Sequence, residues 1–296
     1  MTERSYHIGP NRFDATSIDA GLHVVATPIG NLGDITIRAL NVLAAADYIL
    51  CEDTRITSRL LERYGIRNTM KPYHEHNAEK VRPAIIAALH DGKSFALVSD
   101  AGVPLVSDPG YRLVQSCIAE GLSVTGIPGA SATLTALALS GLPTDCFTFI
   151  GFLPQKSKAR IDLLHSFKKI PSTLIAFESP HRILDALLDI KTALGDRKIA
   201  MARELTKLHE EVLRGTASDV HDILAARESV KGEICLVIAP PHDEIIEISD
   251  SEIRDAINAA LIEHSPSKAA NLVSKALGLT KDDIYARILK LKGSEE

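Results

Sequence analysis

The stretch SDAGVPLVSDPG, Ser99 to Gly110, is the part of the sequence that decides the fold. It follows an apolar run at residues 95–98, which the pattern predicts to be a buried strand. A helix is predicted to begin after it, with Asp108 as N-cap and Pro109 at the first helical position. Strand-to-helix connections usually have about 2–6 residues, so this loop is long. Because open α/β sheets bind ligands at the carboxyl ends of their strands, we predict a ligand-binding loop rather than an ordinary connection.

Strand and helix patterns alternate on both sides of this loop. Strands are predicted at 22–26 and 47–51 before it and at 123–127 after it, and helical patterns lie between them. Alternation with short turns predicts a parallel sheet with right-handed crossovers. We therefore expect an N-terminal α/β domain at 21–143, preceded by a flexible polar arm at 1–20.

The alternation starts again after residues 142–145. Residues 144–241 are expected to form a second α/β domain, which ends where Pro240-Pro241 breaks the chain. Residues 242–296 are expected to form an acidic linker, from Asp243 to Asp255, and a small lysine-rich helical tail. The predicted fold class is α/β, with two α/β domains and a small C-terminal helical segment.

The composition excludes several classes of protein. The 296 residues are 45% hydrophobic, which suffices for a sizeable core. A formal net charge of −5 gives no general attraction to nucleic acid, so any such contact has to come from local patches. The four cysteines show no metal-ligand spacing, and we expect reduced thiols, a cytoplasmic setting and no metal. Neither a signal peptide nor a membrane-spanning run is expected.

Two further loops are predicted at the same sheet edge. Residues 27–34 place Gly30 and Gly33 between a strand and a helix, where we expect the glycines to let the backbone approach a ligand. They match neither the dinucleotide fingerprint nor the Walker A loop. Residues 128–131 place free N–H groups and the Ser131 hydroxyl at a helix start, which suits an anion or serves only as a cap. Three loops at one edge predict a pocket for a small, mostly apolar ligand with a few polar groups.

These residues resemble the tetrapyrrole-methylase-like family of S-adenosylmethionine-dependent methyltransferases over Leu22 to Ile238. The resemblance rests on ATPIGNLGDITIRAL at 26–40 and on the turn at 128–131. The chain departs from the family's Gly-Asp-Pro loop at two of three positions, since it has SDA at 99–101. Within the family, five motifs are similar to the members that methylate the ribose 2′-hydroxyl of a cytidine in 16S ribosomal RNA. These motifs are TPIGNLGD (27–34), CEDTR (51–55), SDAGVPLVSDPG (99–110), FESPHR (177–182) and ELTKLHEE (204–211).

The resemblance implies two α/β domains with S-adenosylmethionine in the cleft between them, a homodimer, and 16S ribosomal RNA as partner, within the small ribosomal subunit. No membrane partner is expected. The expected cofactor-binding residues are Pro28, Ser99, Asp100, Ala101, Val103, Leu105, Ser131 and Ala202.

The chemical step points to the second domain. A ribose 2′-hydroxyl is a poor nucleophile at neutral pH, so a side chain has to accept or orient its proton. If the strands before FESPHR and ELTKLHEE run in the same direction, their loops face one cleft. Glu178 or Lys207 is then the acceptor or orienter, and Arg182 holds a phosphate. The expected catalytic residues are Glu178, Lys207, Arg182 and Glu204. The alternative is a salt-bridged network that only ties the domains together.

RNA contact is expected from two basic patches. The first is Lys156, Lys158, Arg160, Lys168 and Lys169. The second is Lys268, Lys275, Lys281, Arg287, Lys290 and Lys292. Two other functions stay open. One is methylation of a tetrapyrrole precursor. The other is a nucleic-acid-binding regulator, because residues 267–291 read as helix, glycine-containing turn and helix.

Overall fold

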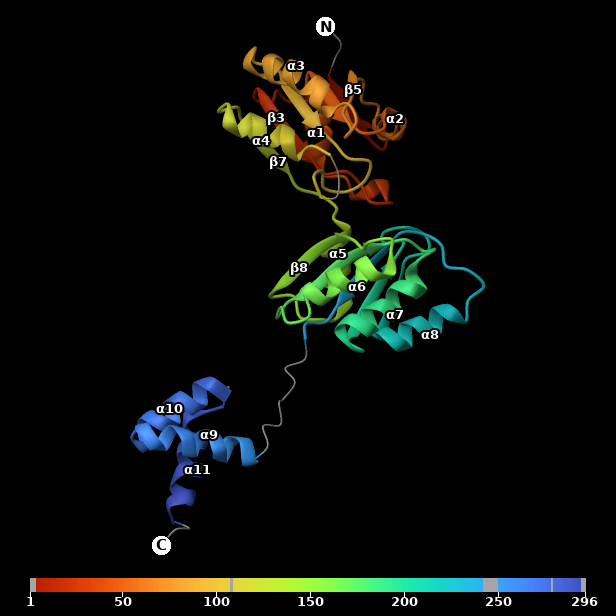
Figure 1. Ribbon diagram of the computed structural model, residues 1–296. Helices are drawn as coiled ribbons and strands as arrows, with labels where there is room; N and C mark the ends of the chain where they lie inside the picture. Colours follow the sequence, from red (N-terminus) through yellow and green to blue (C-terminus); the bar gives the residue numbers. More distant parts are fainter. Residues whose placement is uncertain (1–3, 107–108, 242–249, 278, 294–296) are drawn as a thin grey trace. The chain divides into compact units, whose positions relative to one another are not determined.

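The structure is a computed structural model that describes residues 4–106, 109–241, 250–277 and 279–293. The chain divides into two compact units, Met1–Pro241 and His242–Glu296 (Figure 1). The first unit contains two five-stranded sheets, each flanked by helices. The expected α/β class, with a small C-terminal helical segment, is confirmed.

The first sheet is parallel throughout, in the order β5-β4-β6-β3-β7. We call the part of the unit built on it the first lobe. Its strands are β3 (Gly21–Val25), β4 (Tyr48–Cys51), β5 (Met70–Pro72), β6 (Ser94–Leu97) and β7 (Val124–Ile127). Its helices are η1 (Leu32–Asp34), α1 (Ile37–Ala45), α2 (Thr54–Arg63), α3 (Ala78–His90) and α4 (Tyr111–Ala119).

Apolar side chains cover both faces of this sheet, which is why its strands are continuous hydrophobic runs. Val25 and Ile49 pack on one face with α1 and α2. Leu22 and Leu50 pack on the other face with α3 and α4. With all strands parallel, their carboxyl ends lie at one edge, as the alternating pattern predicts.

The second sheet is mixed, in the order β11-β10-β12-β9-β8, and defines the second lobe. β12 is antiparallel to both β9 and β10, while β8 is parallel to β9. Its strands are β8 (Phe147–Phe152), β9 (Thr173–Glu178), β10 (Lys198–Arg203), β11 (Glu211–Thr216) and β12 (Ile234–Ile238). Its helices are α5 (Ala132–Ser140), α6 (Ser157–Ser166), α7 (Ile183–Leu194) and α8 (Ala217–Ala225).

Helix α5 belongs to the second lobe, although the sequence boundary at 143/144 assigned it to the first domain. Ala136 and Leu137 of α5 pack with Ala200 and Val237 on one face of the second sheet. Helices α6, α7 and α8 cover the opposite face (Figure 1). The apolar face of α5 therefore decides its lobe, and the chain passes between the lobes before α5 rather than after it.

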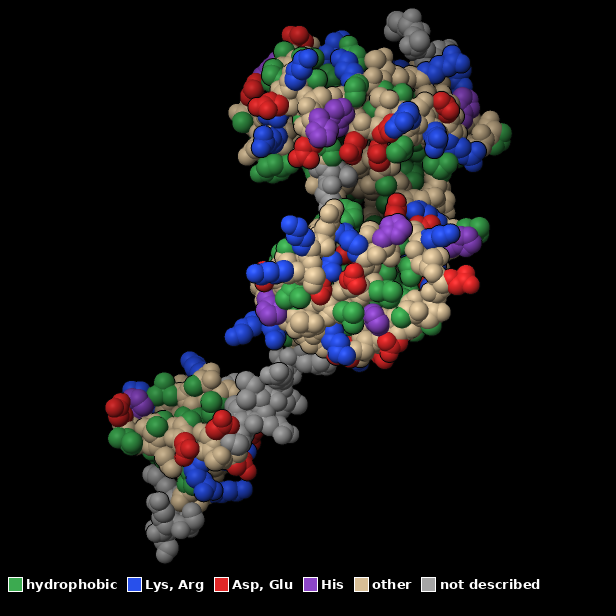
Figure 2. Space-filling model, turned by 45° about the vertical axis from the view of Figure 1, so that its right-hand side comes forward, with side chains coloured by type: hydrophobic (Ala, Val, Ile, Leu, Met, Phe, Trp, Pro, Cys, Tyr) green, Lys and Arg blue, Asp and Glu red, His purple; other side chains and the backbone are tan. Residues whose placement is uncertain are grey.

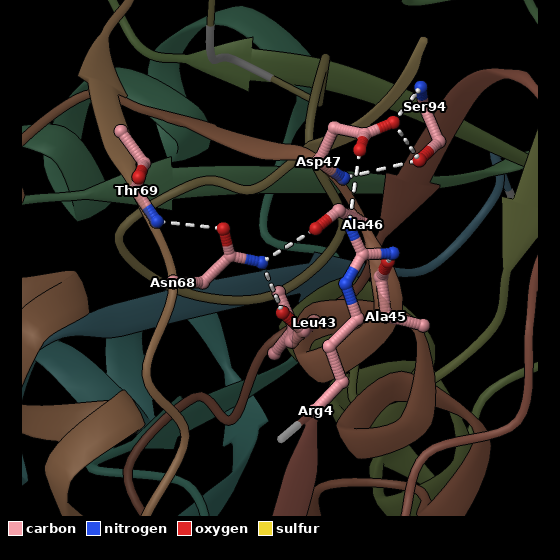
Figure 3. A network of polar contacts seen from close by, with 8 residues as sticks. All are labelled: Arg4, Leu43, Ala45, Ala46, Asp47, Asn68, Thr69 and Ser94. Carbon is pink, nitrogen blue, oxygen red and sulfur yellow. Dashed lines mark hydrogen bonds and ion pairs between the residues drawn. The ribbon is translucent and has the colours of Figure 1, made fainter. Parts of the chain in front are cut away.

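The described part of the N-terminal segment, residues 4–20, is not a loose arm, which corrects the prediction for these residues; residues 1–3 lie outside the described residues. Strands β1 (Ser5–Ile8) and β2 (Asn11–Asp14) form an antiparallel hairpin, and Tyr6 is buried. Arg4 pairs with Asp47 at 3.0 Å, and both the backbone N–H and the hydroxyl of Ser94 donate to the same carboxylate (Figure 3). These contacts hold the segment against the amino-terminal edge of the first sheet.

Helix α4 begins later than predicted. Its N-cap is Gly110, with φ 127°, and Tyr111 is its first residue. A Cβ at Gly110 would lie 2.6 Å from Cδ2 of Leu105, so the loop packs too tightly there for a side chain. Pro109 precedes the helix, and the predicted cap Asp108 lies outside the described residues.

The second unit, taken by itself, contains α9 (Asp250–Glu263), α10 (Pro266–Leu277) and α11 (Lys281–Gly293). Ile257, Val273 and Ile284 belong to its own small core. The last residues of the expected acidic linker, from Asp250, form the start of α9 instead. α10 and α11 agree with the predicted helices, whereas the turn residue Gly278 lies outside the described residues. No described helix is long and apolar enough to cross a membrane.

Arg160 does not belong to an exposed basic patch, because its side chain is 2% exposed. Its guanidinium pairs with Asp189 of α7 at 2.6 Å, and Ser157 donates to the same carboxylate at 2.9 Å. Lys156 and Lys158 are exposed, as predicted. The charge pattern alone could not reveal that one cation of this run faces a buried carboxylate.

This buried pair generates a stability prediction. Arg160→Met should lower the free energy of unfolding by about 3–5 kcal/mol, because it leaves Asp189 without its cation. Lys158→Met on the same helix is the control and should change it by less than about 0.5 kcal/mol. Urea unfolding measures the free energy of unfolding of both variants, and the slope of that free energy against urea concentration should not change. Equal midpoints for the two variants would contradict the assignment.

Candidate functional site

A cavity of about 470 Å³ lies between the strand-end loops of the first lobe and the second sheet. Figure 2 shows the hollow between these two lobes. The lining is mostly apolar. From the first lobe and the segment that joins it to α5 it includes Ile29, Glu52, Asp100, Ala101, Gly102, Val103, Val106 and Ser131. The remaining lining residues are Ala132, Thr133, Phe152, Phe177, Glu178, Ser179, Pro180, Ala202, Leu205, Gly232, Glu233, Ile234 and Cys235.

The loops after β3 and β6 are joined by backbone hydrogen bonds. The N–H of Thr27 donates to the carbonyl of Gly102 at 2.8 Å, and the N–H of Gly102 donates back at 3.1 Å. Gly102 has φ 80°, and a Cβ there would lie 3.2 Å from Ile29. The buried Ser99 donates its hydroxyl to the carbonyls of Ala101 and Gly102. Ser99 therefore shapes the loop and does not line the cavity.

Gly30 serves a different purpose from the one predicted. A Cβ on Gly30 would lie 2.4 Å from Cγ of Lys207, so the glycine admits a side chain of the second lobe rather than a ligand. Neither Gly30 nor Gly33 lines the cavity in the described chain. The sequence pattern correctly marks a close approach here, but the approaching group is the protein itself.

Strands β9 and β10 run in the same direction, the condition set for a shared cleft. Glu178 and Arg203 are both in register with Ile234, from opposite sides of β12. The loops after β9 and β10 therefore leave the same edge of the second sheet. Glu178, the last residue of β9, and Leu205, in the loop after β10, both line the cavity.

The two carboxylate oxygens of Glu178 differ, because only Oε1 has a hydrogen-bond partner among the described residues. Its side chain is 0% exposed, and Oε1 accepts the N–H of Ser179 at 2.6 Å and pairs with Arg182. Oε2 is buried and has no hydrogen-bond partner among the described residues. A buried carboxylate oxygen without a partner costs about 1–3 kcal/mol, so its place on the cavity wall suits a ligand donor.

Lys207 lies in an ionic cluster beside the cavity. Its Nζ pairs with Glu204 at 2.8 Å and with Glu233 at 3.1 Å. Burial by itself would lower the pKa of Lys207, but these two hydrogen bonds raise it. The hydrogen bond from Lys207 lowers the pKa of Glu204. The raised pKa keeps Lys207 a cation that is paired with two carboxylates.

The backbone around this cluster is strained. Glu204 has φ 50° and Thr206 has φ 66°, a conformation that is rare for a β-branched residue. Such residues cost about 1–3 kcal/mol each and collect at functional sites. Between them, Leu205 is buried and lines the cavity. The two strained residues therefore flank Leu205 in the cavity wall and directly precede Lys207, which lies against Gly30.

Asp100 is the partly buried carboxylate of the long loop. The N–H of Asp53 donates to its Oδ1 at 3.2 Å. Burial raises the pKa of Asp100, and this hydrogen bond opposes the rise. Burial also raises the pKa of Cys235, to about 12, so the cavity thiol stays protonated and is unsuited to nucleophilic catalysis.

The structure brings together about half of the predicted site residues. On the cavity wall lie Asp100, Ala101, Val103, Ser131, Ala202 and Glu178. The described cavity lining does not include the other six, which are Pro28, Ser99, Leu105, Arg182, Glu204 and Lys207. Arg182 is held by Glu178, and Leu105 packs with the core beneath α4.

Sequence reasoning missed Glu52, Phe152 and Glu233 on the cavity wall. Glu52 directly follows the buried run of β4, so its position at a strand end was the available signal. Phe152 and Glu233 depend on how the second sheet is assembled, which local patterns do not reveal. Within the described residues, no group of three or more His, Cys, Asp or Glu could hold a metal ion.

Two solved structures have a similar fold. A diphthine synthase superposes with a TM-score of 0.58 at 17% identity and covers 74% of this chain and 89% of its own. A uroporphyrin-III C-methyltransferase from Thermus thermophilus, complexed with S-adenosyl homocysteine, superposes with a TM-score of 0.51 at 16% identity, over 73% and 96%. At these identities the likeness shows the fold alone.

Closer similarity is found among sequence relatives. A protein of Mesorhizobium japonicum named ribosomal RNA small subunit methyltransferase I is 49% identical over 96% of this chain and 97% of its own length. A protein of the same name from Escherichia coli O157:H7 is 42% identical, over 92% and 96%. A profile described as the RsmI C-terminal HTH domain matches residues 247–292. The profile of the tetrapyrrole (corrin/porphyrin) methylases matches residues 21–221, more than half of the chain. The chain therefore belongs to the tetrapyrrole (corrin/porphyrin) methylase family.

Proposed function

We propose that this methyltransferase transfers the methyl group of S-adenosylmethionine to a cytidine ribose 2′-hydroxyl in 16S ribosomal RNA of the small subunit. The single observation that carries the proposal is the end-to-end similarity, at 49% identity, to a relative named for small-subunit ribosomal RNA methylation. The cavity supports the methyl-donor part of the proposal. The 2′-hydroxyl and the cytidine rest on the resemblance of the five motifs.

The cavity residues fit S-adenosylmethionine. The cofactor carries cationic groups and hydroxyl donors, and the partly buried carboxylate of Asp100 is an acceptor of the matching kind. Ser131 is the N-cap of α5, so backbone N–H groups at that helix start suit a carboxylate. The apolar side chains Ile29 and Val103 suit the uncharged parts of the cofactor.

The bound cofactor supplies an electrophilic methyl group on its sulfonium. The chain's residues have to hold the ribose hydroxyl in line with that group and take its proton. Glu178 is the proposed proton acceptor, through Oε2, and Arg182 orients its carboxylate while its exposed part is open to an RNA phosphate. Lys207 and Glu204 are proposed as positioning residues that hold the loop after β10 against the first lobe.

RNA contact is proposed at exposed lysines of the second lobe and at the second unit. Lys156, Lys158, Lys168 and Lys169 are exposed on the second lobe. In the second unit, Arg287 is partly committed to Asp250. The homodimer is a proposal that rests on the family resemblance, and sedimentation tests it. The cytoplasmic setting is a proposal that rests on the cysteine pattern, and cell fractionation tests it.

The function is tested by incubating the full-length protein and methyl-labelled cofactor with purified small subunits or with protein-free 16S RNA. Label on a 2′-O-methylcytidine after nuclease digestion is the expected result. Label on another nucleotide would overturn the cytidine assignment. Label only on a tetrapyrrole, supplied in parallel, would overturn the RNA assignment.

Asp100→Ala should weaken cofactor binding at least tenfold in calorimetry, because a hydrogen bond to a charged group contributes about 1.5–3 kcal/mol. The ionised carboxylate is the binding form, and its pKa is raised. The affinity of the wild type for the cofactor should therefore fall as the pH is lowered. Because the pKa of Asp100 is raised, this fall should begin at a higher pH than the pKa of an ordinary aspartate would give. Asp100→Asn should remove this pH dependence. Unchanged affinity in the alanine variant would refute the role of Asp100.

Glu178→Gln should lower single-turnover methyl transfer roughly 100-fold, the usual size of a general-base contribution. Cofactor and RNA affinities should stay near those of the wild type. Lys207→Met should instead lower thermal stability together with the rate, and Lys207→Arg should restore both, because the lysine acts through its ion pairs. A glutamine variant that transfers methyl at the wild-type rate would exclude Glu178 as the acceptor.

Lys156→Ala with Lys158→Ala should flatten the salt dependence of RNA binding, because each phosphate contact contributes a slope of about 0.7 for single strands. Cofactor affinity should not change. Replacement of two exposed acidic residues, Glu75→Ala with Glu79→Ala, is the matched control and should not flatten the slope. An unchanged slope in the lysine variant would assign these lysines to the solvated surface.

A further inference from the structure

Phe152 is an exposed aromatic side chain on the cavity wall. It ends β8, lines the cavity and is 60% exposed. Only 4% of the chain is aromatic, and it has no tryptophan. The proposed mechanism gives this ring no task, although it lies beside the residues that would bind the cofactor and accept the proton.

A β-bulge directs this ring to the cavity. Side chains alternate along a regular strand, so Phe149 and Phe152, three residues apart, would point to opposite faces. The pairing of β8 with β9 shifts between these two residues, and Gly151 has φ 73°. Both rings consequently pack edge-on against Phe177, at centroid distances of 5.0 Å and 5.3 Å. Bulges are often used to redirect a side chain next to an active site.

The packing holds the ring without covering it. Phe177, which also lines the cavity, contacts Phe152 at an interplanar angle of 61°, the edge-to-face arrangement of aromatic pairs. The exposed lysines Lys156 and Lys158 follow in the same loop and at the start of α6. A fixed aromatic surface followed by cations is the combination that binds an unstacked nucleobase and its neighbouring phosphates.

We propose that Phe152 is the platform on which the base of the target nucleotide stacks, so that the ribose of that nucleotide is held at the cavity. The proposal rests on the proposed function. It assigns to Phe152 a positioning role in RNA binding and none in cofactor binding. Two other occupants of the ring are possible outcomes of the test, namely the adenine of the cofactor and a second copy of this chain.

The test compares three variants of the full-length protein. Phe152→Leu keeps an apolar side chain but removes the ring, and Phe152→Trp keeps a stacking surface. Phe147→Leu is the matched control, because Phe147 is 42% exposed at the other end of the same strand and is absent from the described cavity lining. Single-turnover methyl transfer is measured against the concentration of 16S RNA or small subunits. Calorimetry with S-adenosylhomocysteine and light scattering are measured without RNA.

Phe152→Leu should raise the half-saturating RNA concentration roughly tenfold, the size of one base–aromatic stack. Phe152→Trp should stay within about threefold of the wild type, and Phe147→Leu should match it. Cofactor affinity and molecular mass should be the same in all four proteins. A fluorescent cytidine analogue at the target position should be quenched by the wild type and by Phe152→Trp, but not by Phe152→Leu.

Three results would overturn the proposal. Weaker cofactor binding by Phe152→Leu without RNA would place the ring on the cofactor. A lower molecular mass of Phe152→Leu than of the wild type, measured by light scattering, would place the ring in a subunit interface. Equal RNA dependence of Phe152→Leu and the wild type would show that the ring has no part in RNA binding. If the wild type itself transfers no methyl to RNA, the proposed function fails and this inference fails with it.

Discussion

The site depends on the burial of Ile29 against the second sheet. Ile29 lies in the loop that follows β3 of the first lobe, yet it is 8% exposed and packs with Leu137, Ala200 and Ala202 of the second lobe. Burial of such a side chain contributes about 1.5–3 kcal/mol. Gly30, the next residue, then lets Lys207 pass within contact distance of the backbone. These contacts set the strand-end loops of one sheet against the other and leave a cavity between them.

The chemistry of the cavity follows from which groups the fold leaves without a partner. Lys207 pairs with both Glu204 and Glu233, so this lysine is already committed within the protein and the three groups together keep one negative charge. Glu178 keeps one oxygen unpaired, and Asp100 is partly buried with a raised pKa. A cavity with acceptors on both lobes and apolar side chains between them suits a small ligand that brings its own donors and its own reactive group.

The first lobe could be predicted from the sequence, because buried strand runs alternate with helices along the chain, and the loops after parallel strands necessarily meet at one edge of the sheet. Asp100 and Ser131 are at the cavity for this reason. The second sheet could not be predicted in detail. β12 lies between β9 and β10 in the sheet, although it begins 31 positions after the end of β10 in the sequence. Likewise, local patterns could not show that Arg160 faces a buried carboxylate or that a bulge turns Phe152 to the cavity.

We infer that one ligand contacts both lobes at once. Hydrogen exchange of the full-length protein, with and without saturating S-adenosylhomocysteine, tests it most directly. We expect slower exchange in residues 99–106 and 128–133 of the cavity-facing loops and also in 202–205 and 232–235 of the second lobe. Protection confined to one of the two lobes, with exchange of the other unchanged, would contradict it.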